Sequence, residues 1–265
     1  MNFFEKSLLV ALLFASPICA TSAADLSRKA PAYTPPASVP ATWTGYYFGV
    51  NAGGVWANTD IDWSLNPVGF GPAGVLVEQA ASGRLKTSGF TGGGQIGLNK
   101  QFDALVFGLE VDLQYTDLSG TRTGGVIVPP GLFDSFTQSV ESNWLGTLRG
   151  RLGVAFGSWL PYATGGLAVA RVSYTDFGVF PFLPSTNSAS STETRVGWTL
   201  GGGVEWKFAP SWSIKAEYLY VDLGSTTYTS LNSVVGASAS IIHNHHLTEN
   251  IARVGLNYSF WSGLN

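Results

Sequence analysis

The sequence predicts an all-β fold: an eight-stranded antiparallel transmembrane β-barrel of up-and-down topology, with short turns at one end and long loops at the other. Three observations predict it. Apolar and polar residues alternate over long stretches, which is the period of a β-strand. Charged residues make up 12% of the chain, about half the share usual in soluble domains. The 33 glycines and the aromatic content of 13% favour strands and turns over helices.

The N-terminus is predicted to be a signal peptide, residues 1–24. Lys6 provides the positive charge at its start, and residues 7–15 form a short apolar segment. Small residues follow, and we expect cleavage after Ala23 or Ala24. The apolar segment is too short to cross a membrane, which needs about 20 apolar residues. The segment therefore indicates export rather than anchoring.

Residues 25–42 are predicted to form a Pro-rich periplasmic tether. Four prolines lie in this segment: Pro31, Pro35, Pro36 and Pro40. Such a composition favours an extended chain without a packed core. The barrel is then expected to occupy residues 43–265.

Eight stretches show the alternation expected of strands. The clearest is Leu105–Tyr115, where aliphatic and aromatic residues share one face and Glu110, Asp112 and Gln114 take the other. The eight predicted strands are Gly45–Trp56, Ser88–Gln101, Leu105–Tyr115, Ser142–Phe156, Pro161–Tyr174, Arg195–Phe208, Trp212–Leu223 and Thr248–Trp261. In Pro161–Tyr174 the inward face is ambiguous, because Arg171 shares a face with Leu167 and Val169, and a bulge is one explanation.

The predicted connections alternate between short and long. Short connections are expected at 102–104, 157–159 and 209–211, and long ones at 58–87, 117–139, 175–193 and 224–247. An even number of strands with short turns on one side is typical of outer-membrane barrels, whose short turns are periplasmic. Both ends of the chain are therefore expected in the periplasm.

The apolar face is predicted to contact lipid rather than to fill the barrel. It carries large aromatic residues, namely Trp198, Trp206, Phe208, Trp212, Tyr218 and Tyr220. The interior of an eight-stranded barrel is too narrow for so many rings. Interfacial girdles are expected at Trp43, Tyr46, Trp159, Tyr162, Trp212 and Tyr258. The alternative is a secreted soluble barrel or sandwich, which leaves the low surface charge unexplained.

Charged residues of inward parity are expected to form a network inside the barrel. They are Glu110, Asp112, Arg149, Arg151, Arg195, Glu205, Lys207, Lys215, Glu217 and Arg253, joined by Arg171 if its strand is regular. Unpaired buried charges are unfavourable, so acids and bases are expected to pair and to plug the lumen. The alternative is a narrow porin-like channel for ions or small solutes.

The three histidines, His243, His245 and His246, fall in the last predicted external loop. Imidazole is a common metal ligand, so surface binding of hemin or a metal ion is a weak alternative function. No supporting residues are identified around them, and the prediction is a solvated loop with no metal and no cofactor. No Ser-His-acid arrangement is assigned either, so no enzyme activity is predicted.

Charge and cysteine content exclude two further classes of function. The net charge is −3, and the 14 basic residues are spread along the chain, which disfavours binding to nucleic acid. The single cysteine, Cys19, lies in the predicted signal peptide. The mature chain is therefore expected to have neither a disulfide nor thiol chemistry.

Several segments resemble a known family. Residues 43–54 (Trp-Thr-Gly-Tyr-Tyr-Phe-Gly-Val-Asn-Ala-Gly-Gly), Leu148–Gly153, Pro161–Ala168, Lys215–Gly224 and Asn250–Phe260 are similar to segments of the small outer-membrane immunogenic, porin-like proteins of Gram-negative bacteria. The resemblance spans the mature chain, except that five residues follow Phe260, where the family's last strand ends in an aromatic residue.

The resemblance implies an OmpA/OmpX-type barrel in the outer membrane. Its expected role is structural or surface-interacting, as a surface antigen that contributes to envelope integrity. The expected partners are membrane lipid and lipopolysaccharide, the barrel-assembly machinery through the last strand, and extracellular ligands through the long loops.

Overall fold

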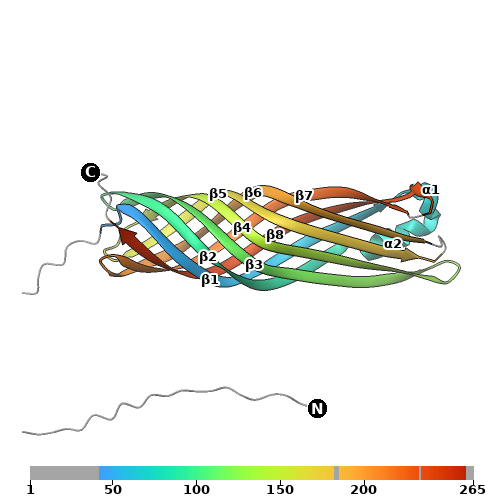
Figure 1. The fold of residues 1–265 in the computed structure, drawn as a ribbon, viewed down its shortest axis with the longest axis horizontal. Helices are drawn as coiled ribbons and strands as arrows, with labels where there is room; N and C mark the ends of the chain where they lie inside the picture. The colour runs from blue at the N-terminus through green and yellow to red at the C-terminus, as the bar shows by residue number, and fades with distance from the viewer. Residues whose placement is uncertain (1–41, 182–184, 233, 261–265) are drawn as a thin grey trace, which may run out of the picture. The chain divides into compact units, whose positions relative to one another are not determined.

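The computed structural model describes residues 42–181, 185–232 and 234–260, which form one closed antiparallel barrel (Figure 1). Each strand pairs with its neighbour in sequence, and the last pairs with the first. The strands are β1 (Gly45–Leu65), β2 (Gly83–Phe102), β3 (Leu105–Val128), β4 (Leu132–Val154), β5 (Trp159–Phe180), β6 (Ser185–Ala209), β7 (Trp212–Asn232) and β8 (Gly236–Phe260). The predicted eight-stranded topology is confirmed. The predicted signal peptide, residues 25–41 of the tether and residues 261–265 lie outside the described residues.

The strands extend far beyond their predicted ends on one side of the barrel. The segments expected as long loops, 58–87, 117–139, 175–193 and 224–247, are mostly strand. For example, β3 continues to Val128 and β4 begins at Leu132. The connections on this side are therefore short, apart from residues 66–82 between β1 and β2.

The difference arises because the polarity of the two barrel faces reverses along each strand. In β3 the outward residues are apolar from Leu105 to Tyr115, whereas the outward residues that follow, from Asp117 to Thr123, are polar. Inside the barrel, Leu118 and Val128 are buried. The alternation with a period of two continues, but the outward residues are now polar and the inward ones apolar, as in a soluble barrel. The Ser- and Thr-rich outer face therefore resembles a loop in the sequence.

A ring of outward aromatic residues marks the level at which the polarity reverses: Trp56, Phe90, Tyr115, Trp144, Trp198 and Tyr220. We call the part of the barrel on the side of this ring that contains the starts of β1 and β3 the membrane segment. We call the part on the other side of the ring, toward Val128, the extension. In β3 the membrane segment is Leu105–Tyr115, and about 9–11 residues suffice for a strand to cross a membrane. The extension therefore stands beyond the lipid.

A second group of outward aromatic residues lies at the other edge of the membrane segment. Trp159 stacks on Trp206 with ring centroids 5.7 Å apart, and Trp212 meets Tyr258 at 5.0 Å. Two of the expected girdle residues are instead inside the barrel, because Trp43 and Tyr162 are only 4% and 7% exposed. Trp43 packs in the mouth ahead of β1, and Tyr162 has inward parity.

β5 is regular, and this settles the ambiguous parity of Pro161–Tyr174. Its inward residues are all buried except Gly166, which is half-buried, and Arg171 is exposed on the same outward face as Leu167. The expectation that Arg171 would enter the lumen if its strand were regular was wrong. The bulge lies in the neighbouring strand β4, where the register shifts between Ser142 and Trp144.

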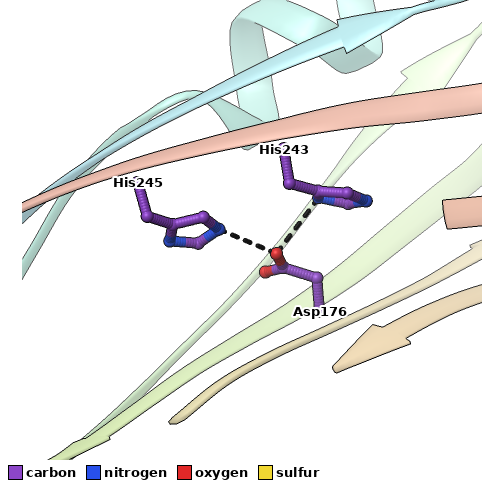
Figure 2. Close-up of side chains that lie close together, drawn as sticks. All are labelled: Asp176, His243 and His245. Carbon is purple, nitrogen blue, oxygen red and sulfur yellow. Dashed lines mark hydrogen bonds and ion pairs between the residues drawn. The ribbon is translucent and has the colours of Figure 1, made fainter. Parts of the chain in front are cut away.

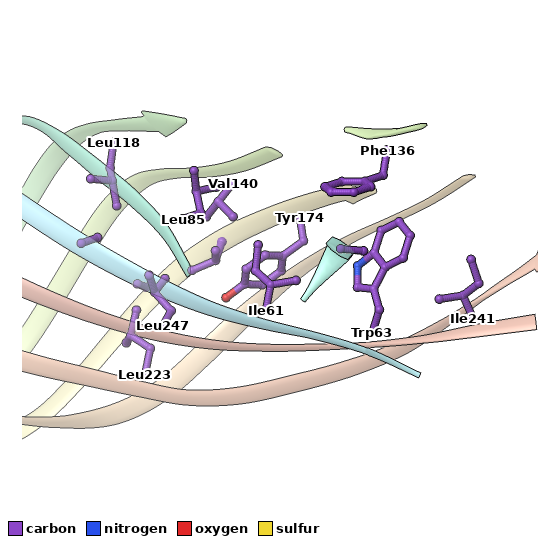
Figure 3. Close-up of a cluster of buried hydrophobic side chains, with 14 of the residues drawn as sticks. Ile61, Trp63, Leu85, Leu118, Phe136, Val140, Tyr174, Leu223, Ile241 and Leu247 are labelled. Carbon is purple, nitrogen blue, oxygen red and sulfur yellow. The ribbon is translucent and has the colours of Figure 1, made fainter. Parts of the chain in front are cut away.

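The interior of the extension is an apolar core (Figure 3). Its largest buried members include Ile61, Trp63, Leu118, Phe136, Val140, Tyr174, Leu223, Ile241 and Leu247. Among the described residues, those from seven of the eight strands, all except β6, contribute to this cluster or its edge, so it ties most of the wall of the extension together. The core lies directly beyond the lumen of the membrane segment along the barrel axis.

A helical cap covers the distal end of the extension, far from the start of β1 and the end of β8 (Figure 1). It consists of α1 (Pro67–Phe70), η1 (Gly71–Ala73) and α2 (Gly74–Ala81). Phe70 packs edge-on against Phe180 at 5.1 Å. Arg122 Nη1 and Gln138 Nε2 donate to the carbonyl of Ala81 at 2.6 and 3.0 Å, which satisfies a free C-terminal carbonyl of α2. None of the helices in the described part of the chain is both long and apolar enough to cross a membrane.

β6 and β7 separate in the extension. Their register passes from Asn187↔Asn232 directly to Trp198↔Asp222, so the described residues 188–197 and 223–231 form no β-pairs with each other. Arg195 bridges this gap, because its guanidinium donates to the carbonyls of Leu223 and Ser225. We call this opening the β6–β7 seam.

Candidate functional site

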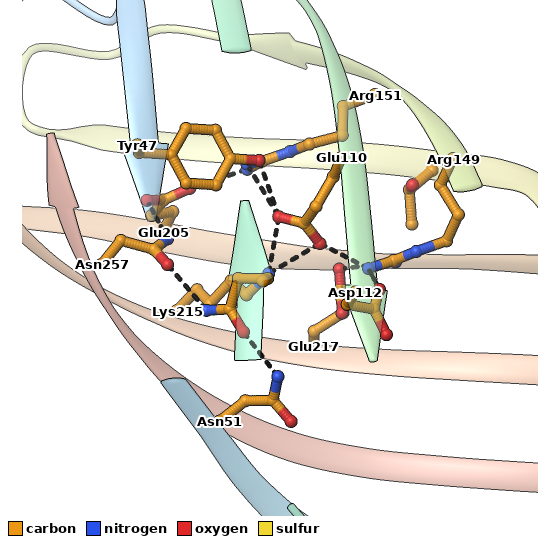
Figure 4. Close-up of polar contacts among 12 residues, drawn as sticks. Tyr47, Asn51, Glu110, Asp112, Arg149, Arg151, Glu205, Lys215, Glu217 and Asn257 are labelled. Carbon is orange, nitrogen blue, oxygen red and sulfur yellow. Dashed lines mark hydrogen bonds and ion pairs between the residues drawn. The ribbon is translucent and has the colours of Figure 1, made fainter. Parts of the chain in front are cut away.

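Eight charged side chains fill the lumen of the membrane segment (Figure 4). Four are acids and four are bases, and all are between 1% and 5% exposed: Glu110, Asp112, Glu205, Glu217, Arg149, Arg151, Lys215 and Arg253. Their formal charges cancel. All of them were expected inside the barrel from the parity of their strands.

Acids and bases on adjacent strands face each other within this network. Glu110 of β3 is in register with Arg149 of β4, and the two form an ion pair. Glu217 of β7 is in register with Arg253 of β8, whose Nε donates to Glu217 Oε2 at 2.8 Å. A carboxylate held by a guanidinium at two nitrogens is among the stronger protein contacts.

Other contacts cross the lumen and join opposite walls. Lys215 Nζ of β7 lies 2.8 Å from Glu110 Oε2 of β3. Arg149 Nη1 of β4 lies 3.0 Å from Glu217 Oε1 of β7. Because such side chains meet in the middle, the network fills the lumen rather than lining a passage.

Neutral groups satisfy most of the remaining donors and acceptors of the network, although Arg151 Nε has no hydrogen-bond partner among the described residues. Tyr47 donates its hydroxyl to Glu110 Oε2 at 2.6 Å and accepts from Arg151 Nη1 at 2.8 Å. Arg151 Nη2 pairs with Glu205 at 2.7 Å, and its guanidinium lies over the Tyr162 ring at 4.0 Å. A buried polar network stabilises the fold when nearly all its members have partners in this way.

Arg195 and Lys207, which were expected in the network, lie elsewhere. Arg195 occupies the β6–β7 seam, and its charged partner is Glu193 at 3.5 Å. Lys207 lies at the opposite mouth, where its Nζ donates to the carbonyl of Thr42 at 2.6 Å and faces the Trp43 ring. Parity predicts on which side of the wall a residue lies but not its depth in the barrel.

A second polar cluster lies inside the extension (Figure 2). His243 and His245 belong to β8 and are 1% and 0% exposed, so the expectation of a solvated external loop was wrong. Two residues spaced by two on a strand share a face, and here that face is the interior. His246 points outward, with its Nε2 3.6 Å from Asp222 Oδ1.

Asp176 of β5 joins the two inward histidines. Its Oδ2 lies 3.1 Å from His243 Nδ1 and 2.9 Å from His245 Nε2. Tyr228 donates its hydroxyl to the same oxygen at 2.6 Å, and Ser230 Oγ lies 2.8 Å from His243 Nε2. A carboxylate and two imidazoles that converge in this way are able to hold a metal ion.

This cluster also contains a Ser-His-acid set that the sequence did not reveal: Ser230, His243 and Asp176. Ser230 and Asp176 were not recognised as partners of His243, because both lie in segments that the sequence analysis assigned to loops. A usable signal existed in β5, where the alternation of Val172, Tyr174 and Asp176 continues the period of the predicted strand.

Inward glycines make room for the large side chains of the membrane segment. A Cβ on Gly97 of β2 would overlap the phenol of Tyr47, which Glu110 and Arg151 hold in place. We therefore expect Gly97→Ala to destabilise the barrel by about 1–3 kcal/mol in urea unfolding, as overpacking of a core does. Gly94→Ala, on the outward face of the same strand, is the matched control, because its nearest atom is 3.6 Å away. Equal stability of the two variants would contradict this packing.

Comparison with known proteins confirms the resemblance found in the sequence. The outer membrane protein beta-barrel domain model matches residues 11–260. The chain is similar to the 31 kDa outer-membrane immunogenic protein of Brucella melitensis, at 34% identity over 96% of this chain and 100% of the relative. It is also similar to the 25 kDa outer-membrane immunogenic protein of Brucella abortus, at 25% identity over 96% and 98% of the two chains.

Among solved structures, the outer membrane protease OmpT from Escherichia coli aligns with a TM-score of 0.47 and 10% identity, over 83% of this chain and 98% of that one. The family match, the two relatives and the closed barrel described above agree on an integral outer-membrane protein. This chain belongs to the outer membrane protein beta-barrel domain family.

Proposed function

We propose that this outer-membrane barrel is closed to solutes and has a structural and surface-interaction role. The observation that carries the proposal is the filling of its interior. The charge network occupies the membrane segment, and the apolar core occupies the extension. Eight strands enclose little more than the volume of their own inward side chains. A wide diffusion pathway therefore has no room.

Planar bilayers test this proposal against the alternative of a narrow porin-like channel. The purified barrel is expected to give no steady conductance. A steady single-channel conductance whose ion selectivity changes in the Lys215→Ala variant would favour a channel lined by the network. Bilayers with detergent alone and with a known porin provide the negative and positive controls.

The proposed orientation places both ends of the barrel in the periplasm and the extension outside the cell. In support, Tyr46 of β1 is in register with Phe260 of β8 at the end with the shorter turns. Outer-membrane barrels carry their short turns on the periplasmic side. The extension and its helical cap then project from the cell surface.

Cysteine labelling tests this orientation, because the only cysteine of the chain is Cys19. Thr123→Cys lies on the outward face of the extension, and Asp103→Cys lies in the β2–β3 turn. With a membrane-impermeant maleimide, intact cells should label Thr123→Cys, and Asp103→Cys should react only after permeabilisation. The reverse pattern would contradict the orientation.

The partners follow from the two outer surfaces. Lipid contacts the apolar face of the membrane segment, and lipopolysaccharide surrounds the polar face of the extension above it. β8 ends at Phe260 and is the element offered to the barrel-assembly machinery. Extracellular ligands would bind the strands of the extension and its cap, because few of the described residues at that end lie outside these elements.

Enzyme activity is not part of the proposed function. Ser230, His243 and Asp176 lie in the order of a hydrolase triad, but each is at most 2% exposed. They are enclosed by the barrel wall and by apolar residues such as Trp63 and Phe136. A nucleophile needs access to its substrate, which this burial denies.

A further inference from the structure

We propose that Asp176, His243 and His245 form a binding site for a divalent transition-metal ion, with Zn²⁺ as the best-matched metal. The site lies inside the extension, beyond the membrane segment. It is independent of whether the membrane segment conducts.

The ligand atoms are almost in place. Asp176 Oδ2 lies 3.1 Å from His243 Nδ1 and 2.9 Å from His245 Nε2, and all three ligand atoms lie within 4.8 Å of one another. Ligands at Zn²⁺ distances of about 2.1 Å in a tetrahedron are roughly 3.4 Å apart. To admit the ion, the two imidazole nitrogens would have to move away from Asp176 Oδ2 by a few tenths of an ångström and toward each other by up to about 1.4 Å.

Charge supports the same conclusion. Asp176 is 1% exposed, and in the described ranges it forms no ion pair with a lysine or an arginine. This distinguishes it from the acids of the membrane segment, such as Glu110 and Glu217, which face several guanidinium or ammonium groups. An ionised carboxylate buried in this way is unfavourable unless a cation compensates it, and a bound metal ion would do so.

The ligand types select the class of metal. Two imidazoles and one carboxylate suit Zn²⁺ and its first-row neighbours, whereas Mg²⁺ and Ca²⁺ require oxygen ligands. Three protein ligands leave a fourth position open on a tetrahedral ion. The hydroxyl of Tyr228 is 2.6 Å from Asp176 Oδ2 and 3.1 Å from His245 Nε2, so it lies beside that position.

Surrounding residues hold the two imidazoles in orientation. Ser230 Oγ is 2.8 Å from His243 Nε2, which leaves Nδ1 directed at Asp176. The Tyr228 ring stacks on both imidazoles, with centroids 5.1 Å from His243 and 5.5 Å from His245. Outer partners that fix the ligand rings are characteristic of protein metal sites.

We expect a metal ion to enter through the β6–β7 seam, where the wall has no β-pairing. Tyr228 belongs to the stretch 223–231 of β7 that does not pair with β6, and its side chain is only partly buried although it points inward. The cluster therefore lies one side chain below the surface of the extension. An ion arriving from the external aqueous phase would reach Asp176 past this tyrosine.

Metal titration of the whole mature chain, produced without a histidine tag, tests the proposal. The chain has three histidines, so a tag would dominate the signal. The protein in detergent micelles is stripped with EDTA, dialysed and titrated with Zn²⁺ against a chromogenic chelator. One equivalent is expected to bind, and millimolar Mg²⁺ or Ca²⁺ is expected not to displace it. Co²⁺ should give the visible absorption of a four- or five-coordinate site.

Substitutions identify the ligands. Asp176→Asn, His243→Ala and His245→Ala should each weaken binding by more than the roughly 10–100-fold typical of losing an outer partner. Two control variants lie on β8. His246→Ala removes the outward histidine, and Glu249→Gln neutralises a buried acid that is not part of the proposed site. Both control variants should bind as the wild type does. Faster migration of unheated samples on gels checks that each variant is folded.

The proposal is overturned if the wild-type chain binds no Zn²⁺ or Co²⁺. It is also overturned if His246→Ala abolishes binding, or if the three ligand variants retain it. Should a ligand variant fail to fold, the Co²⁺ spectrum of the wild type decides. Absorption typical of octahedral coordination by water would then contradict a site built from two imidazoles and a carboxylate.

Discussion

Glu217→Ala is expected to destabilise the barrel by about 3–5 kcal/mol, because it leaves buried cations without their partner. Glu217 holds Arg253 through two nitrogens, pairs with Arg149 at 3.0 Å and accepts from Tyr162 at 3.0 Å. Bulk solvent does not reach these pairs, because their side chains are 0% exposed. The change should appear as a lower temperature at which the folded, fast-migrating band is lost on gels.

A second substitution tests whether the lower stability of Glu217→Ala comes from an unpaired charge. The double variant Glu217→Ala with Arg253→Ala should be more stable than Glu217→Ala alone, because one of the cations left without a partner is removed. Glu217→Ala with Arg195→Ala is the matched control and should recover no stability, because Arg195 lies in the β6–β7 seam. Unchanged melting together with altered ion selectivity in bilayers would overturn the plugged barrel in favour of a pathway.

Leu109→Arg should destabilise the barrel by about 2–4 kcal/mol, because it places a charge near the middle of the lipid. Leu109 is 53% exposed on the outward face and lies near the centre of Leu105–Tyr115. The variant is expected to fold in lower yield into lipid vesicles and to unfold at lower urea concentration.

Thr123→Arg is the control for this charge. It lies on the outward face of the same strand, but in the extension, where the outward residues are polar and lie beyond the hydrocarbon of the membrane. Its effect is expected to stay within about 0.5 kcal/mol, as for most surface substitutions. An equal loss of stability in both variants would show that lipid reaches the extension and would contradict the boundary at the aromatic ring.

The membrane segment was predictable because a single chemical rule governs it. Along Leu105–Tyr115 every outward residue is apolar and the inward ones after Val106 are polar or glycine, so the alternation is visible without a structure. The extension has the same period of two, but its outward residues are polar and its inward residues are mostly apolar. Its outward serines and threonines resemble loop residues, and only the buried partners on other strands show that the segment is sheet.

The site was predictable only in part, for a related reason. Parity identified Glu110, Arg149 and Glu217 as inward, since each lies in a recognised strand. It did not place Arg195, whose depth depends on where β6 and β7 stop pairing. It also did not bring Asp176 to His245, because their contact crosses the barrel between segments that had been assigned to loops.

In the proposed orientation the extension projects from the cell surface, and its sheet structure then determines how another molecule recognises it. Glu141 lies beside Ser119 on one side and Ser173 on the other, each on a different strand. An antibody or phage protein that covers Glu141 therefore contacts three stretches of chain that are far apart in the sequence. A synthetic peptide carries only one of them, and heating the barrel disperses all three. The epitopes of this surface are accordingly discontinuous, and sera raised against the folded barrel should bind neither linear peptides nor the heat-unfolded chain.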